Sequence, residues 1–147
     1  MNLLVNIDVD DLEAGIRFYQ DALGLQLSRR FDDGFVELLG ASSAIYLLQK
    51  DPGSAVSDAS SQRRDYARHW TPVHLDFIVD HLDAALERAV AAGARRESDI
   101  LVEPYGKLAL LSDPFGHGFC LLEFTGRGYD ELVSPSTHSE GEASTPA

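Results

Sequence analysis

The sequence has little cysteine and little positive charge. Cys120 is the only cysteine among 147 residues, which excludes an intrachain disulfide and favours a reducing compartment. Lysine and arginine total 12 against 24 aspartates and glutamates, so the formal net charge is −12. Nucleic acids and anionic membranes are not attracted to an acidic protein, and we therefore expect neither as a partner.

Long apolar runs are also missing. No run approaches the roughly 20 residues that cross a bilayer. The first residues lack the basic and apolar stretches of a secretory signal, so a cytoplasmic protein is expected. The length and the 44% apolar share suit one domain with a real core, which we place at residues 1–132. Residues 133–147 are small and polar, and we predict a disordered tail there.

What is present is a strand–helix pattern that occurs twice. Residues 73–79 alternate between apolar side chains and the pair His74 and Asp76, which predicts a strand with one apolar face. A helix with Asp80 as N-cap follows, with an apolar stripe that includes Val90, and Gly93 ends it. Residues 9–16 match residues 79–86 at an offset of 70 residues, 79 − 9. The repeat predicts two modules, at residues 3–50 and 73–125.

Each module continues with three further strands. In the first, a helix capped by Asp10 and running to Ala22 precedes strands at residues 25–31, 35–39 and 44–49. In the second, strands are expected at residues 94–102, with some irregularity, and at residues 107–111 and 118–124. The predicted fold class is therefore α+β, with two βαβββ modules whose curved sheets enclose a cleft and whose helices lie outside.

The repeat also pairs positions on the faces opposite the helices. Leu4 corresponds to His74, Asn6 to Asp76, and Asp8 to Ile78. Asn6, Asp8, His74 and Asp76 are thus candidate ligand-binding groups in the cleft, with hydrogen bonding on the sheet surface as the alternative. His117 follows a turn and is predicted to form local hydrogen bonds. Cys120 is either a ligand-binding group or a small buried apolar residue.

Residues 51–72 differ from the rest of the chain. A small, polar stretch leads into a basic and aromatic cluster at residues 63–70. One interpretation is a solvated linker helix. The other is a lid in which His69 and Trp70 close on an anionic or aromatic ligand.

Three motifs resemble the vicinal oxygen chelate superfamily, which groups glyoxalases, bleomycin-resistance proteins and extradiol dioxygenases. They are the opening of the first helix at residues 11–25, the opening of the second module at residues 73–93, and a closing pattern at residues 104–106 and 113–117. Together they span residues 3–125. The resemblance implies a glyoxalase-like domain, and it implies a homodimer, which the open sheet edges also favour.

The resemblance further implies a metal site on the first and last strands of the two modules. The corresponding positions here are Leu4, His74, Cys120 and, less closely defined, Tyr46. Leucine cannot bind a metal and a thiolate suits softer ions, so the site is predicted to be degenerate. The predicted function is binding of a small organic ligand without a metal cofactor. The alternative is a lyase, isomerase or dioxygenase that uses one divalent metal, a nonstandard ligand set and His74, the best catalytic candidate.

Overall fold

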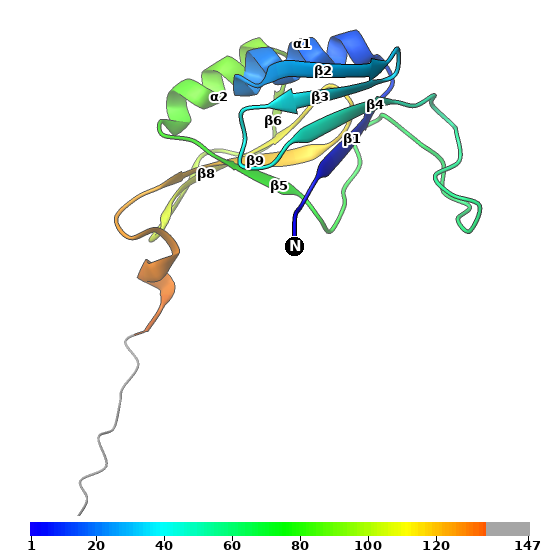
Figure 1. Ribbon diagram of the computed structural model, residues 1–147. Helices are drawn as coiled ribbons and strands as arrows, with labels where there is room; N and C mark the ends of the chain where they lie inside the picture. The colour runs from blue at the N-terminus through cyan, green and yellow to red at the C-terminus, as the bar shows by residue number, and fades with distance from the viewer. Residues whose placement is uncertain (135–147) are drawn as a thin grey trace, which may run out of the picture.

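Two βαβββ modules follow one another in the computed structural model, which describes residues 1–134 (Figure 1). The first contains β1 (Val5–Val9), α1 (Leu12–Leu23), β2 (Gln26–Asp32), β3 (Phe35–Leu39) and β4 (Ile45–Gln49). The second contains β5 (Leu75–Ile78), α2 (Leu82–Ala91), β6 (Arg95–Arg96), β7 (Leu101–Glu103), β8 (Gly106–Ser112) and β9 (Gly118–Phe124). A 3-10 helix, η1 (Gly128–Leu132), follows β9. The predicted tail lies outside the described residues from residue 135 onward.

Each module forms its own sheet with the same topology. The strand orders are β1-β4-β3-β2 and β5-β9-β8-β6, with β7 also paired to β8. In both sheets the first and last strands of the module are parallel neighbours, and the remaining pairs are antiparallel. Both helices lie on the same side of the molecule, outside the sheets (Figure 1). The predicted α+β fold class is confirmed.

The strand expected at residues 94–102, with some irregularity, is divided into β6 and β7, and Ser98 and Asp99 form local bonds between them. The Arg96 guanidinium donates to the Ser98 carbonyl oxygen at 2.7 Å and lies 3.2 Å from the Asp99 carboxylate. These side-chain bonds compete with the regular ladder, and the Leu110 amide of β8 donates to the Ser98 hydroxyl at 3.3 Å in place of a backbone carbonyl.

The helix N-caps lie one residue later than Asp10 and Asp80, which corrects both predictions. Asp11 caps α1, with its carboxylate accepting from the Ala14 amide at 2.9 Å, and His81 occupies the cap of α2 without a side-chain bond. The last strand of each module supplies a further acceptor. Leu12 N donates to Gln49 Oε1 at 3.0 Å, and Leu82 N donates to Glu123 Oε2 at 2.7 Å. Both helices thus have a first-turn amide satisfied by a neighbouring strand.

The core lies between the helices and the inner faces of the two sheets. From α1 it takes Leu12, Ile16, Phe18, Tyr19 and Ala22, and from α2 it takes Leu82, Ala85, Leu86 and Ala89. Two predicted core residues are wrong. Val90 is 44% exposed, and Val73 is 79% exposed because β5 begins only at Leu75. The Tyr19 hydroxyl donates to the buried Asp113 carboxylate at 2.6 Å and joins α1 to the β8–β9 turn across the modules.

Residues 51–72, called the connecting segment below, contain no helix, so the linker-helix interpretation is wrong. Their one regular feature is an antiparallel bridge between Ala55 and Arg63. Neither α1 nor α2 has the length and apolar character needed to cross a membrane, and residues 1–134 contain no other α-helix.

Candidate functional site

Three chemically active side chains meet on the open face of the second sheet. Asp76 on β5 is directly opposite Cys120 on β9, and His74 immediately precedes β5. His74 Nε2 lies 3.2 Å from Asp76 Oδ1, and the ligand atoms of the three residues all lie within 4.8 Å of one another. The period of two along a strand brings His74 and Asp76 to one face, and the register of β5 on β9 adds Cys120.

The Cys120 thiol is buried and held in its protonated form. Burial is the main cause that raises its pKa to about 12, and the nearby Asp76 carboxylate, which also hydrogen-bonds the thiol, raises it further. The thiolate is the nucleophilic form of cysteine, so this residue is not a ready nucleophile at neutral pH.

The open face of the first sheet carries a different polar row. Asn6, Tyr46, Glu37 and Arg29 are cross-strand neighbours on β1, β4, β3 and β2. The Arg29 guanidinium donates to both oxygens of Glu37 at 2.8 and 2.6 Å, and the Tyr46 hydroxyl donates to the same carboxylate at 2.8 Å. The hydrogen bond from Arg29 contributes most to lowering the pKa of Glu37 to about 2, and the bond from Tyr46 lowers it further. The charge of this row is already neutralised within the protein.

Sequence reasoning identified Tyr46 and Asn6 but missed Glu37 and Arg29. A single glutamate between the apolar residues of β3 was the available signal, because a strand position between two buried neighbours points to the opposite face. Its partner could not be assigned, since the pairing of Arg29 with Glu37 depends on an irregular register between β2 and β3.

The connecting segment is bound to both modules. The Arg64 guanidinium lies 2.6 Å from the Asp8 carboxylate on β1, and the Arg68 guanidinium lies 2.5 Å from Glu97 after β6. The Tyr66 hydroxyl donates to the Lys50 carbonyl oxygen at 2.7 Å. The predicted ligand group Asp8 is therefore already paired with a cation of the segment. Trp70, expected to close over the cleft, is 77% exposed.

His117 forms the predicted local hydrogen bonds through its backbone, and its ring also makes long-range contacts that the sequence did not predict. Its Nε2 lies 2.7 Å from the Asp8 carbonyl oxygen, and its Nδ1 lies 3.1 Å from His69 Nε2. The Asp113 carboxylate accepts from the His117 amide at 2.9 Å within the same turn.

A cavity of about 410 Å³ lies between β1 and β5. Its polar lining includes four predicted site residues, Asn6, Asp8, His69 and His74, together with Thr71 and His117. Its apolar lining comes from both modules and includes Val5, Leu75, Phe77 and Phe119. The tertiary structure thus brings half of the predicted ligand-binding set to one place.

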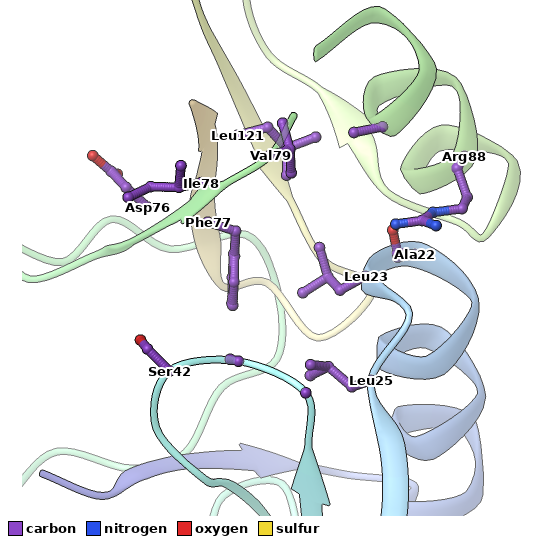
Figure 2. Close-up of a pocket in the computed structure, with 13 residues that line it drawn as sticks. Ala22, Leu23, Leu25, Ser42, Asp76, Phe77, Ile78, Val79, Arg88 and Leu121 are labelled. Carbon is purple, nitrogen blue, oxygen red and sulfur yellow. The ribbon is translucent and has the colours of Figure 1, made fainter. Parts of the chain in front are cut away.

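The remaining predicted residues lie elsewhere. Trp70 and Cys120 line a smaller cavity of about 120 Å³ that also borders His74. Asp76 borders a third cavity, of about 320 Å³, between the end of α1 and β5. Figure 2 shows Phe77 and Leu25 extending into this third cavity, whereas the Asp76 carboxylate points away from it. Tyr46 lines none of these three cavities.

Comparison with known proteins gives a family and a set of similar folds. A family model for the glyoxalase-like domain matches residues 4–122. The fosfomycin resistance protein FosX of Listeria monocytogenes has a TM-score of 0.67 at 19% identity, over 90% of this chain and 98% of that one. A glyoxalase/bleomycin resistance protein/dioxygenase family enzyme of Burkholderia phytofirmans PsJN has a TM-score of 0.64 at 24% identity, over 83% and 97%.

A lactoylglutathione lyase of Agrobacterium tumefaciens is similar as well, with a TM-score of 0.58 at 20% identity over 84% of this chain and 92% of that one. No curated protein matches the sequence significantly. At these identities, the similarity to solved structures establishes the fold and leaves the chemistry of the site to its own residues.

Proposed function

The chain belongs to the glyoxalase-like domain family of the vicinal oxygen chelate superfamily, and from this premise we propose that it binds a small organic molecule in the cavity between β1 and β5. The ligand has a carboxylate or carbonyl oxygen that contacts His74 and an apolar, aromatic body. Binding uses no divalent metal.

The cavity itself carries this proposal. Its volume of about 410 Å³ is within the range of small-molecule sites. Apolar side chains from both modules surround a few polar groups, which is the composition that orients a ligand without a covalent step. His74 can donate to an oxygen of the ligand, and Asn6 offers an amide donor and acceptor on the opposite wall.

The metal set implied by the family does not fit these residues. Leu4 is 58% exposed and has no donor atom, the Tyr46 hydroxyl donates to Glu37, and the Cys120 thiol is protonated. Magnesium, manganese and ferrous ions require several oxygen or imidazole ligands. Among residues 1–134, His74, Asp76 and Cys120 are the only group of three or more potential ligands close enough for one ion.

A panel of aromatic carboxylates tests the proposal. We expect a benzoate-type probe to raise the unfolding temperature of the protein, by an amount that increases with the logarithm of the probe concentration above its Kd. Cyclohexanecarboxylate, which lacks the aromatic ring, and benzyl alcohol, which lacks the charge, are expected to bind more weakly. His74→Ala should weaken binding about tenfold while the far-UV circular dichroism is unchanged. Equal binding by wild type and His74→Ala would contradict the assignment of the site.

A second candidate is a metal-dependent lyase, isomerase or dioxygenase. The observation that favours it is the proximity of an imidazole, a carboxylate and a thiol at His74, Asp76 and Cys120, a donor set that suits zinc. Elemental analysis of the purified protein, followed by zinc and manganese titration, distinguishes the two functions. Equimolar zinc that is lost in His74→Ala and in Cys120→Ala would replace our proposal with this one.

We also propose that the protein is a homodimer. β1 and β2 are the edges of the first sheet, and β5 is an edge of the second. Apolar residues are exposed on or beside two of these edges, with Leu4 58% and Ile78 65% exposed. Such edges are normally covered in stable proteins. Light scattering at micromolar concentration should give twice the chain mass, and a monomer mass would contradict the dimer.

A further inference from the structure

Two histidines join the connecting segment to both modules at the cavity between β1 and β5. His69 Nδ1 lies 2.9 Å from the Ala67 carbonyl oxygen, and His69 Nε2 lies 3.1 Å from His117 Nδ1. His117 Nε2 lies 2.7 Å from the carbonyl oxygen of Asp8. The four ring nitrogens thus form one line of contacts from the segment, through the β8–β9 turn, to β1.

The ends of this line determine where its hydrogens are. A backbone carbonyl oxygen can only accept, so His69 Nδ1 and His117 Nε2 must both carry hydrogen. A neutral imidazole has one N–H. With both rings neutral, the nitrogens that face each other at 3.1 Å are two lone pairs, which cannot form a hydrogen bond. One additional proton converts this contact into an N–H···N bond.

We propose that His69 and His117 share one additional proton, and that this proton holds the connecting segment closed against the cavity between β1 and β5. The pair then carries three hydrogens on four nitrogens and a single positive charge. Removing the proton leaves two facing lone pairs, and adding a second places two N–H groups against each other. The closed arrangement requires a pair with one additional proton, and both changes separate the rings.

Backbone contacts place the segment where the rings can act on it. The His69 amide donates to the Gly116 carbonyl oxygen at 3.1 Å. A Cβ at Gly116, whose φ is +85°, would overlap the Ala67 carbonyl oxygen, so the segment approaches this turn as closely as glycine allows. Movement of the His69 ring away from His117 therefore strains the contact between segment and turn directly.

The charged groups around the pair are themselves bonded. On the β1 side, the Asp8 carboxylate is paired with Arg64, and on the turn side the Asp113 carboxylate accepts from Tyr19 and from the His117 amide. Arg68, next to His69, is paired with Glu97. The Tyr66 ring meets His117 edge-on, and His74 borders the same cavity. None of the hydrogen bonds identified at these groups reaches the two facing nitrogens, so the shared proton has no competing acceptor among them.

Amide exchange at position 69 tests the proposal. The protection factor, corrected for the intrinsic exchange rate, should be bell-shaped in pH, because closure requires one and only one additional proton. Loss of one hydrogen bond should lower it about three- to tenfold on the alkaline side of its maximum. A protection factor that does not change with pH would overturn the proposal.

Two substitutions of His69 distinguish the effect of the shared proton from the effect of losing the side chain. In His69→Gln the amide can donate to neutral His117 Nδ1, so closure should persist and its alkaline loss should disappear. In His69→Ala protection should be low at every pH. His81→Gln, at an N-cap without a side-chain bond, is the matched control and should behave as wild type. An alkaline loss in His69→Gln equal to that of wild type would contradict the shared proton.

Ring nitrogen shifts of the wild-type protein provide a measurement that needs no variant. In the closed state they should show hydrogen on His69 Nδ1 and on His117 Nε2, with one further proton between the rings. A spectrum in which both rings are neutral while position 69 remains protected would overturn the proposal.

Discussion

The open faces of the two sheets differ more than their backbones do. In the first module Glu37 is neutralised by Arg29 and bonded by Tyr46, so the polar row is complete in itself. In the second, the corresponding face carries His74, Asp76 and Cys120, and no lysine or arginine forms an ion pair with the Asp76 carboxylate in the described part of the chain. The carboxylate of the first face is thus paired with a cation of the protein, whereas the Asp76 carboxylate of the second face has, among residues 1–134, only His74 as a charged partner.

The buried sides of the two modules have stayed alike. In both, a side chain at the end of the last strand accepts from the first helical amide, Gln49 for Leu12 and Glu123 for Leu82. Both helices pack on their sheets through leucine and alanine. A duplicated fold can therefore keep its capping and packing while the opposite faces acquire different chemistry, since side chains of one strand alternate between the two.

The largest expected effect comes from breaking the junction that makes the modules one unit. Asp113→Ala leaves the Tyr19 hydroxyl and the Phe115 and His117 amides without their acceptor. Each buried donor without a partner costs about 1–3 kcal/mol, so the free energy of unfolding should fall by about 3 kcal/mol or more in urea titration. Tyr19→Phe leaves one oxygen of the buried Asp113 carboxylate without its donor but keeps the two backbone bonds, so it should cost about 1.5–3 kcal/mol, less than Asp113→Ala. A loss in Tyr19→Phe as large as that in Asp113→Ala would contradict this role of Asp113.

The second-largest expected effect is a loss of folding stability at low pH that originates in the first module. The folded pKa of Glu37 is about 2, below the ordinary 4.5, so its contribution to stability is present above about pH 4.5 and is lost as the pH falls toward 2. Glu37→Gln should lower stability at neutral pH and flatten this acid dependence. Thermal unfolding from about pH 2 to 7 measures both. Equal acid slopes in the two proteins would show that Arg29 does not stabilise the carboxylate.

The second module should respond at the other end of the pH scale. The folded pKa of Cys120 is about 12, above the ordinary 9.0, so its contribution is complete below pH 9 and is lost as the pH rises toward 12. Cys120→Ser cannot ionise in this range. The difference in unfolding free energy between wild type and this variant should change by about 1 kcal/mol between pH 8 and 10. If this difference does not change with pH, the thiol lies in a more polar environment than its burial implies.

The smallest expected effect is a change in the reactivity of Cys120 when the neighbouring charge of Asp76 is removed. Asp76→Asn removes the negative charge beside Cys120 and should lower the pKa of the thiol. Alkylation by iodoacetamide at pH 8 should then be about three- to tenfold faster, because the thiolate is the reactive form. Asp99→Asn, at a fully exposed carboxylate paired with Arg96, is the control and should react like wild type. Equal rates in all three proteins would mean that burial alone protects the thiol.

Much of the fold could be predicted from local patterns. The strands at residues 35–39 and 118–124 have the predicted bounds, and both helices begin one residue after their N-caps at the expected turns. The errors occur where a pattern ends. Val73 continues the alternation of apolar and polar residues but lies before the start of β5 and is exposed. Alternation indicates which face a side chain would have, but it does not indicate where pairing stops.

The candidate site was predictable only in part, and the reason is sequence distance. His74 and Asp76 were predicted to share a face because they are two residues apart on one strand. Other contacts at the site join residues that are far apart along the chain, 56 residues for Arg64 and Asp8 and 48 for His69 and His117. Which charges meet across such distances depends on the course of the connecting segment over both modules.

The sequence by itself determined the duplication, the secondary structure of each module and the apolar faces on which the helices pack, because these follow from the spacing of side chains along the backbone. The tertiary structure alone decided that Glu37 is neutralised, that Asp8 is paired and that two histidines face each other across 3.1 Å. Those outcomes depend on register and loop path, and both are set by packing of the whole chain.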